Sequence, residues 1–287
     1  MVSVWELDFY SRPLLDEQQK RRWEVLICEG LVDTQADPDQ LFRYSKFLSN
    51  TEVNSLNLQA ALEEAIAQAP SPPGRIRYFR YQMQNMIQRA CEGAGIPAVA
   101  SRRTLALQRW LQERQQLVYP NQPGYTTAPA PSVAAPPPSP RPLPDALIGQ
   151  RWSFASLPAS AFEDLPEWSI GFGETFPLSL APIAPATPIP GLLIFSPRAT
   201  ALAAWLSGLE LAYWRVETGP PAQLVLETGA ADSWILAALG SLSLLAEAQA
   251  FEAAKAAADQ VHFLAVQTSP DSQEFAGFWL LRTAMAV

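Results

Sequence analysis

Residues 5–13 have the sequence WELDFYSRP, and this stretch decides the fold of the first half of the chain. Large apolar side chains stand at every second position, at Trp5, Leu7 and Phe9. Such alternation is typical of a strand with one buried face. Residues 22–28 repeat the pattern, and the charged connector between the two runs predicts an exposed hairpin loop. We therefore expect a strand pair at the foundation of an N-terminal α+β domain.

The rest of the first half alternates between helical and extended patterns. Apolar residues at helical spacing predict helices over residues 53–69, 83–91 and 101–114. Residues 75–81 and 96–100 have the composition of short strands. The order β-β-α-β-α-β-α predicts a small mixed sheet covered by helices.

Residues 120–144 differ in kind from what precedes them. Ten of these 25 positions are Pro, and no periodic apolar pattern is present. Such a composition predicts an extended, Pro-rich linker. It divides the chain into an N-terminal domain, residues 1–119, and a C-terminal domain, residues 145–287.

The C-terminal domain is also predicted to be a mixed α/β sheet structure, which makes the fold class α+β with two sheet domains. Its helices are expected at residues 199–206 and 242–258. Its strands are expected at residues 168–176, 191–195, 209–217, 223–227, 261–267 and 275–282.

Charge is distributed unevenly along the chain. Residues 1–120 contain 14 Lys+Arg and 14 Asp+Glu, whereas residues 121–287 contain 6 and 14, so the whole net charge of −8 lies in the second half. Binding to duplex nucleic acid requires many phosphate contacts, so DNA is not an expected partner. A local basic surface in the first half remains compatible with these counts.

Motifs for catalysis and for cofactors are missing from the sequence. No phosphate loop, nucleophile elbow or dinucleotide fingerprint occurs, and no His/Cys cluster has zinc spacing. Cys28 and Cys91 are predicted to be reduced core thiols, and His262 to be structural. No apolar run reaches the roughly 20 residues of a membrane span. We expect no metal, no cofactor and no transmembrane segment.

Three acidic residues of the opening strands suggest an enzymatic alternative. Glu6, Asp8 and Glu24 share one face of the predicted hairpin, as the carboxylates of a metal-dependent nuclease would. Alternation in a sheet with one wet face also places charges there. The solvated face is the favoured interpretation, so the protein is not expected to be an enzyme.

The sequence RIRYFRY at residues 75–81 has the composition of a single-stranded RNA site. Guanidinium groups contact phosphates and aromatic faces stack on unpaired bases. Residues 75–114 contain eight Arg against two acidic residues, a local net charge of +6. The candidate RNA-binding residues are Arg75, Arg77, Tyr78, Phe79, Arg80, Tyr81, Arg102 and Arg103.

A structural alternative fits the same stretch. In a half-buried strand the aromatic side chains belong to the core, and the arginines pair with acidic residues at positions 33–39 or at Glu63 and Glu64. The residue pattern leaves both hypotheses open and favours the structural one.

Four separated blocks together resemble a known family. They are residues 5–13, residues 142–149 (PLPDALIG), residues 205–210 (WLSGLE) and residues 279–282 (WLLR). The set resembles the Tab/Atab family of cyanobacteria and chloroplasts, RNA-binding proteins tied to translation and assembly of photosystem I. The blocks extend over both domains.

The resemblance implies binding to single-stranded A/U-rich RNA in the leader of a photosystem I reaction-centre message, and promotion of its translation. It also implies translation or photosystem assembly proteins as partners, and a place in the cytoplasm of a cyanobacterium, near thylakoids. The alternative is a protein-only assembly factor or chaperone for a photosystem subunit. An acidic C-terminal domain suits protein docking in either case.

The family's C-terminal Trp-Leu-Leu tripeptide, linked to RNA binding, is matched by Trp279, Leu280 and Leu281. The acidic residue expected after Arg282 is replaced by Thr283. The tripeptide lies in a predicted terminal strand beside two Phe residues, where a Trp is more often part of the core. Direct RNA contact and a purely structural role both remain open, and the second is favoured.

Overall fold

The computed structural model describes residues 3–31, 37, 40–128, 139–149 and 151–283. The chain divides into two compact units, one of residues 1–136 and one of residues 137–285. Both contain mixed sheets and helices, as the sequence predicts. No helix in the described parts of the chain is long and apolar enough to cross a membrane.

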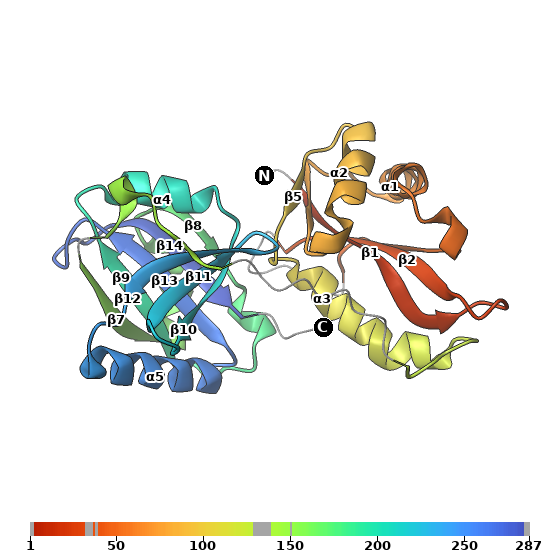
Figure 1. Ribbon diagram of the computed structural model, residues 1–287. Coiled ribbons are helices and arrows are strands. Elements are labelled where there is room, and N and C mark those ends of the chain that lie inside the picture. The colour runs from red at the N-terminus through yellow and green to blue at the C-terminus, as the bar shows by residue number, and fades with distance from the viewer. Residues whose placement is uncertain (1–2, 32–36, 38–39, 129–138, 150, 284–287) are drawn as a thin grey trace. The chain divides into compact units, whose positions relative to one another are not determined.

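The N-terminal domain is built on a five-stranded sheet in the order β3-β2-β1-β4-β5 (Figure 1). The predicted hairpin is confirmed, because β1 and β2 pair antiparallel. Strand β1 also pairs parallel with β4, which makes it the middle of the sheet. The strands are β1, Val4–Leu15, β2, Arg21–Glu29, β3, Arg43–Leu48, β4, Arg75–Tyr78, and β5, Ala98–Ala100. The helices are α1, Ser55–Gln68, α2, Gln84–Gly93, and α3, Leu105–Glu113.

Helices cover both faces of this sheet. Trp5, Leu7 and Phe9 of β1 are fully buried in a cluster with apolar residues of α1 and α2. On the other face, Leu107 of α3 packs in a second cluster with Leu26 of β2. Figure 1 shows α1 and α2 on one side of β1 and β2, and α3 on the other. The polar residues of β1 therefore face a helix and not water.

The linker is shorter than the predicted 120–144. The stretch around Gly124 belongs to the N-terminal domain, because Leu15 N–H donates to Gly124 O at 2.8 Å and Thr126 N–H donates to Pro13 O at 3.0 Å. At the other end, Arg141–Pro142 forms strand β6 of the C-terminal domain, and Leu143 is buried in its core. Backbone pairing at both ends thus overrides the Pro-rich composition.

The C-terminal domain contains two sheets. A four-stranded sheet has the order β10-β11-β12-β6, and a five-stranded sheet has the order β7-β9-β13-β14-β8. Both contribute to one core together with α4, Ala199–Ser207, and α5, Leu242–Ala257. The remaining strands are β7, Arg151–Pro158, β8, Ile170–Thr175, β9, Pro188–Phe195, β10, Leu211–Glu217, β11, Gln223–Thr228, β12, Asp232–Ala238, β13, Val261–Gln267, and β14, Phe275–Arg282.

Most predicted elements of this domain are confirmed, and three strands are new. The hairpin of β10 and β11, helix α5, and the closing pair of β13 and β14 lie where the sequence places them. Strands β6, β7 and β12 were not predicted. In the first half, β3 is likewise an addition to the predicted strands.

Candidate nucleic-acid interface

The strand predicted over residues 75–81 ends earlier, at Tyr78. Tyr78 is the last residue of β4 in register with both Leu7 of β1 and Ala100 of β5. Phe79 and Arg80 then leave the sheet, and Tyr81 begins a 3-10 turn. The prediction of a strand over residues 75–81 is therefore wrong beyond Tyr78.

Burial separates the eight basic and aromatic candidates into three groups. Arg77 is 4% exposed, Tyr78 is 0% exposed and Arg103 is 7% exposed, so these three lie inside the domain and have no surface for phosphates or bases. Tyr81 is 57% exposed. The remaining candidates are half-buried: Arg75, Phe79, Arg80 and Arg102.

Arg80 is held by the acidic residue at the centre of β1. Its Nε lies 2.8 Å from Asp8 Oδ1, and Arg12 Nη2 lies 3.0 Å from Asp8 Oδ2. Asp8 is fully buried. Burial alone would raise the pKa of Asp8, but the charges of Arg12 and Arg80 lower it overall. Asp8 is thus an ionised internal counter-ion of two arginines.

Glu24 of β2 continues the same network. Its carboxylate accepts hydrogen bonds from Arg12 Nε at 2.9 Å, from the Tyr119 hydroxyl at 2.5 Å, and from Arg114. Arg12 therefore bridges Asp8 and Glu24 on one face of the sheet. Both buried carboxylates are thus compensated by internal cationic and hydrogen-bonding partners.

Glu6 completes the acidic group in a different manner. It is 2% exposed, and its Oε2 accepts a hydrogen bond from Leu107 N–H at 2.7 Å, in the first turn of α3. Burial raises the pKa of Glu6 to about 8, against the opposing effects of this hydrogen bond and of Arg77. The N-cap residue of α3, Thr104, has no capping side-chain bond of its own. Glu6 supplies that function from the sheet.

These contacts correct two expectations. The face that carries Glu6, Asp8 and Glu24 is not solvated, since all three are buried beneath α3 and the arginines. The local charge of +6 over residues 75–114 does not all face outward either. Arg77, Arg80 and Arg114 from that segment face Glu6, Asp8 and Glu24 respectively. These three arginines face acids of the opening strands; of the partners that the sequence suggested, residues 33–36, 38 and 39 lie outside the described residues.

What remains at the surface is a compact aromatic and cationic edge. The guanidinium of Arg80 lies over the ring of Tyr10, 4.0 Å from its centroid, and near Phe79, 4.8 Å from its centroid. Tyr81 follows directly and is the most exposed of these side chains. Because β4 and β5 are parallel neighbours, the segment after β5 that contains Arg102 leaves the sheet at the same end as Phe79 and Arg80. Ligands of open α/β sheets bind at such carboxyl ends of strands. We call Tyr10, Phe79, Arg80 and Tyr81 the β4 edge.

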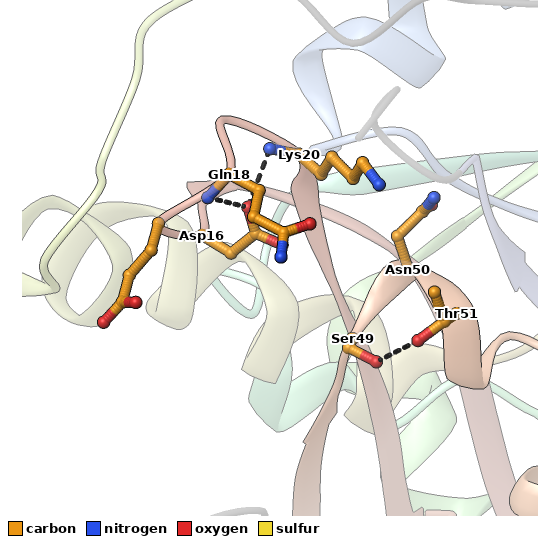
Figure 2. A pocket seen from close by; sticks show the side chains of 7 residues that line it. Asp16, Gln18, Lys20, Ser49, Asn50 and Thr51 are labelled. Carbon is orange, nitrogen blue, oxygen red and sulfur yellow. Dashed lines mark hydrogen bonds between the residues drawn. The ribbon is translucent and has the colours of Figure 1, made fainter.

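Two hollows lie elsewhere in the N-terminal domain, beside the loop of the β1–β2 hairpin. Figure 2 shows one of about 310 Å³, lined by residues 16–18, Lys20 and residues 49–51. Within it, Asp16 Oδ1 accepts from the backbone N–H groups of Gln18 and Lys20 at 2.9 and 2.8 Å. The other, of about 440 Å³, is lined by residues 15–17, Arg22, Pro123 and Gly124. Neither includes a residue of the β4 edge, and acidic residues line both.

Family models match nearly the whole chain. Residues 4–114 match the N-terminal domain of the RNA-binding protein Tab2/Atab2, and residues 130–282 match its C-terminal domain. The chain belongs to the Tab2/Atab2 family.

Two plant proteins are similar in sequence to nearly the whole chain. The protein "TAB2 homolog, chloroplastic" of Zea mays is 37% identical over 287 residues, covering 98% of this chain and 71% of that protein. The protein of the same description from Arabidopsis thaliana is 37% identical, covering 98% of this chain and 74% of that protein.

Solved structures give only weak likenesses. A simian T-cell lymphotropic virus intasome in complex with PP2A regulatory subunit B56 gamma matches with a TM-score of 0.31 and 16% identity, over 42% of this chain and 43% of that one. The HTLV-2 integrase catalytic core domain with magnesium matches with a TM-score of 0.26 and 15% identity, over 42% and 75%. Neither supports a statement about function.

The tripeptide that the Tab2/Atab2 resemblance singles out lies inside the C-terminal domain. Trp279, Leu280 and Leu281 are 2%, 1% and 2% exposed, in a strand paired on both sides. A Cβ atom at Gly277 would lie 2.4 Å from the Trp279 ring, so the indole occupies the space that this glycine leaves. The tripeptide is part of the core and has no face available for stacking on a base.

His262 is structural as predicted. Its Nε2 accepts from the backbone N–H of Trp214 at 3.1 Å, and its Nδ1 lies 2.9 Å from Gln260 O. Burial, followed by the charge of Lys255, lowers the pKa of His262 to about 3. A neutral imidazole satisfies both backbone groups at once. Among the described residues, no group of three or more His, Cys, Asp or Glu is arranged to hold a metal ion.

Proposed function

We propose that this chain is a single-stranded RNA-binding factor that promotes translation and assembly of photosystem I reaction-centre subunits. Membership of an RNA-binding family supports the first part. A/U-rich leader sequences, the photosystem I message and a partner among translation or assembly proteins rest on the resemblance of the four sequence blocks. Its place of action in this proposal is a cyanobacterial cytoplasm near thylakoids; the plant relatives are described as chloroplastic.

The β4 edge is the proposed RNA-binding surface. The observation that carries this assignment is the exposed Tyr81 ring next to a guanidinium that is already fixed by Asp8 and flanked by Tyr10 and Phe79. The exposed Tyr81 ring offers a flat surface to an unpaired base, worth about 1–3 kcal/mol, and the fixed guanidinium places a positive charge beside it. Arg102 is half-buried and adds a cation at the same end of the sheet, whereas Arg75 begins β4 and lies at the other end of that strand.

The proposal includes no catalysis. Asp8 and Glu24, the carboxylates that a nuclease would use, are both engaged by Arg12, and Asp8 is also engaged by Arg80. Glu6 is directed to the first turn of α3. This arrangement supports a structural role for all three. Incubation of labelled RNA with the protein and Mg²⁺ or Mn²⁺ tests it, since cleavage that disappears in Asp8→Asn would contradict the proposal.

In this proposal the tripeptide acts on RNA binding indirectly. Burial of Trp279, Leu280 and Leu281 supports a role in holding the C-terminal domain together. Loss of RNA binding in a Trp279 variant would then follow from unfolding.

Filter binding over a salt series tests the function as a whole. The full chain is titrated into A/U-rich and scrambled single strands of equal length, from about 50 to 300 mM salt. We expect tighter binding to the A/U-rich strand and an affinity that falls as salt rises, because phosphate contacts release counter-ions.

The second candidate function is protein-only assembly or chaperoning of a photosystem subunit. The acidity of the second half of the chain, with 6 Lys+Arg against 14 Asp+Glu over residues 121–287, favours it. Absence of RNA binding at every salt concentration would support this candidate over the first.

A further inference from the structure

The C-terminal domain presents an aromatic cluster at its surface. Trp205 of α4 and Trp234 of β12 are both half-buried, and their rings meet edge to face with centroids 5.0 Å apart. Trp234 Nε1 donates to Thr228 Oγ1 at 3.1 Å, which fixes the orientation of this indole. Neither ring belongs to the tripeptide strand, and the proposed RNA site does not involve them.

A guanidinium from the same chain already occupies this cluster. Arg141 of β6 lies over the Trp234 ring, 4.4 Å from its centroid, and its Nη2 lies 2.7 Å from Asp232 Oδ1. The side chains of Arg141 and Asp232 are 56% and 59% exposed. An aromatic face beside a carboxylate is a site that recognises guanidinium groups. Exposed ion pairs contribute little to stability, so Arg141 can leave the site without unfolding the domain.

The charge of the surrounding domain indicates which kind of ligand would replace Arg141. Residues 137–285 contain 6 Lys+Arg against 14 Asp+Glu. Arg215, Lys255 and Arg282 are paired with carboxylates of the same domain. Such a surface repels a phosphate backbone and attracts cationic segments. Trp and Arg side chains are also those that most often dominate protein–protein contacts.

We propose that Trp205, Trp234 and Asp232 form a docking site for an arginine-rich segment of a partner protein, and that Arg141 occupies this site until the partner displaces it. A guanidinium of the partner then takes the position over Trp234 and the ion pair with Asp232. Because only the fraction of molecules with Arg141 displaced can bind, Arg141 lowers the apparent affinity for the partner.

The experiment measures fluorescence anisotropy of a fluorescein-labelled 12-residue peptide with the repeat Arg-Gly-Gly, titrated with the full chain at fixed salt. Arg141→Ala is expected to bind the peptide about two- to fivefold more tightly than the unmodified protein. Arg151→Ala is the matched control, since it removes one exposed cation from β7 of the same domain. Asp232→Asn is expected to weaken binding, with Glu247→Gln on α5 as its matched control.

Whether Arg141→Ala binds the peptide more tightly or less tightly decides if Arg141 competes with the partner for the site. Binding by Arg141→Ala that is equal to Arg151→Ala, or weaker, would overturn the proposal, as would Asp232→Asn binding like Glu247→Gln. A second titration uses a 12-nucleotide oligouridylate with photocrosslinking. Crosslinks at Trp234 that Arg141→Ala abolishes would make this a nucleic-acid site and would also overturn the proposal. Thermal unfolding of each variant confirms that the domain remains folded.

Discussion

The carboxyl group of Glu6, in the middle strand of the N-terminal sheet, accepts a hydrogen bond from the backbone N–H of Leu107 at 2.7 Å. Those two residues are 101 positions apart in sequence, and their contact fixes the first turn of α3 against the sheet. An acceptor at a helix N-terminus satisfies backbone donors that otherwise have no partner. Helix α3, which covers the polar face of β1, is therefore attached to the sheet through a buried, titratable group.

Glu6 is predicted to make stability depend on pH. Its pKa is about 8 in the folded protein and 4.5 as its ordinary value, so between these values the folded state binds more protons than the unfolded state. The free energy of unfolding should therefore fall as pH rises from about 5 to 8, by at most about 1.4 kcal/mol per pH unit from this group. Urea unfolding at pH 5, 6, 7, 8 and 9 measures this dependence.

Glu6→Gln is the variant that isolates the effect. The amide oxygen still accepts from Leu107 N–H but does not titrate. We expect the slope of stability against pH to flatten over this window. An unchanged slope would show that another group is responsible.

The ion pair between Asp8 and Arg80 is predicted to support the fold as well as the proposed RNA surface. Removing one partner of a buried pair leaves the other charge uncompensated, and Asp8 keeps only Arg12. Arg80→Ala should lower the free energy of unfolding by about 3 kcal/mol, whereas Arg89→Ala, which removes an exposed arginine of α2, should leave it nearly unchanged. Chemical unfolding of both variants compares them. Equal stability of the two would show that the pair contributes nothing.

The alternation of apolar and polar residues predicts the N-terminal domain well where the apolar side chains are the buried ones. Trp5, Leu7 and Phe9 point to one buried face, and the structure confirms it. The other face misleads, because Asp8 and Glu24 look like solvent-facing residues. Arg12 is near both acids in sequence, but their other charged partners, Arg80 for Asp8 and Arg114 for Glu24, stand 72 and 90 positions further along the chain. Nothing local in sequence encodes such distant pairing.

The candidate RNA-binding site could not be predicted in full from local pattern either. An alternating strand through Tyr81 would place Arg77 and Tyr81 on one face, but β4 ends at Tyr78 and leaves Arg77 buried. The surplus of arginine over residues 75–114, next to three acids in the opening strands, was the available signal for internal pairing. Strands β6, of two residues, and β12 are not predicted because their pairing depends on tertiary contacts more than on alternation.

Tyr81 is predicted to contribute to RNA affinity without contributing to stability. It is 57% exposed, so Tyr81→Ala should leave the melting temperature unchanged. Loss of one stacked base costs about 1–3 kcal/mol, which corresponds to roughly 5- to 150-fold in Kd. Tyr125→Ala is the control, since Tyr125 is 41% exposed in the same domain and lies outside the β4 edge. Equal affinity of both variants for an A/U-rich strand would remove the β4 edge from the proposal.

Trp279 is predicted to affect RNA binding only through folding. Trp279→Ala should lower the free energy of unfolding by about 3–5 kcal/mol, because a large side chain leaves a cavity in the core. Gly277→Ala tests the same place by overpacking instead of by a cavity, since its added methyl group meets the Trp279 ring and leaves the indole present. RNA affinity is then measured at a low temperature at which circular dichroism shows each variant to be folded. We expect affinity equal to that of the unmodified protein for both. Weaker binding by folded Trp279→Ala, with full binding by folded Gly277→Ala, would instead indicate that the indole itself contacts RNA.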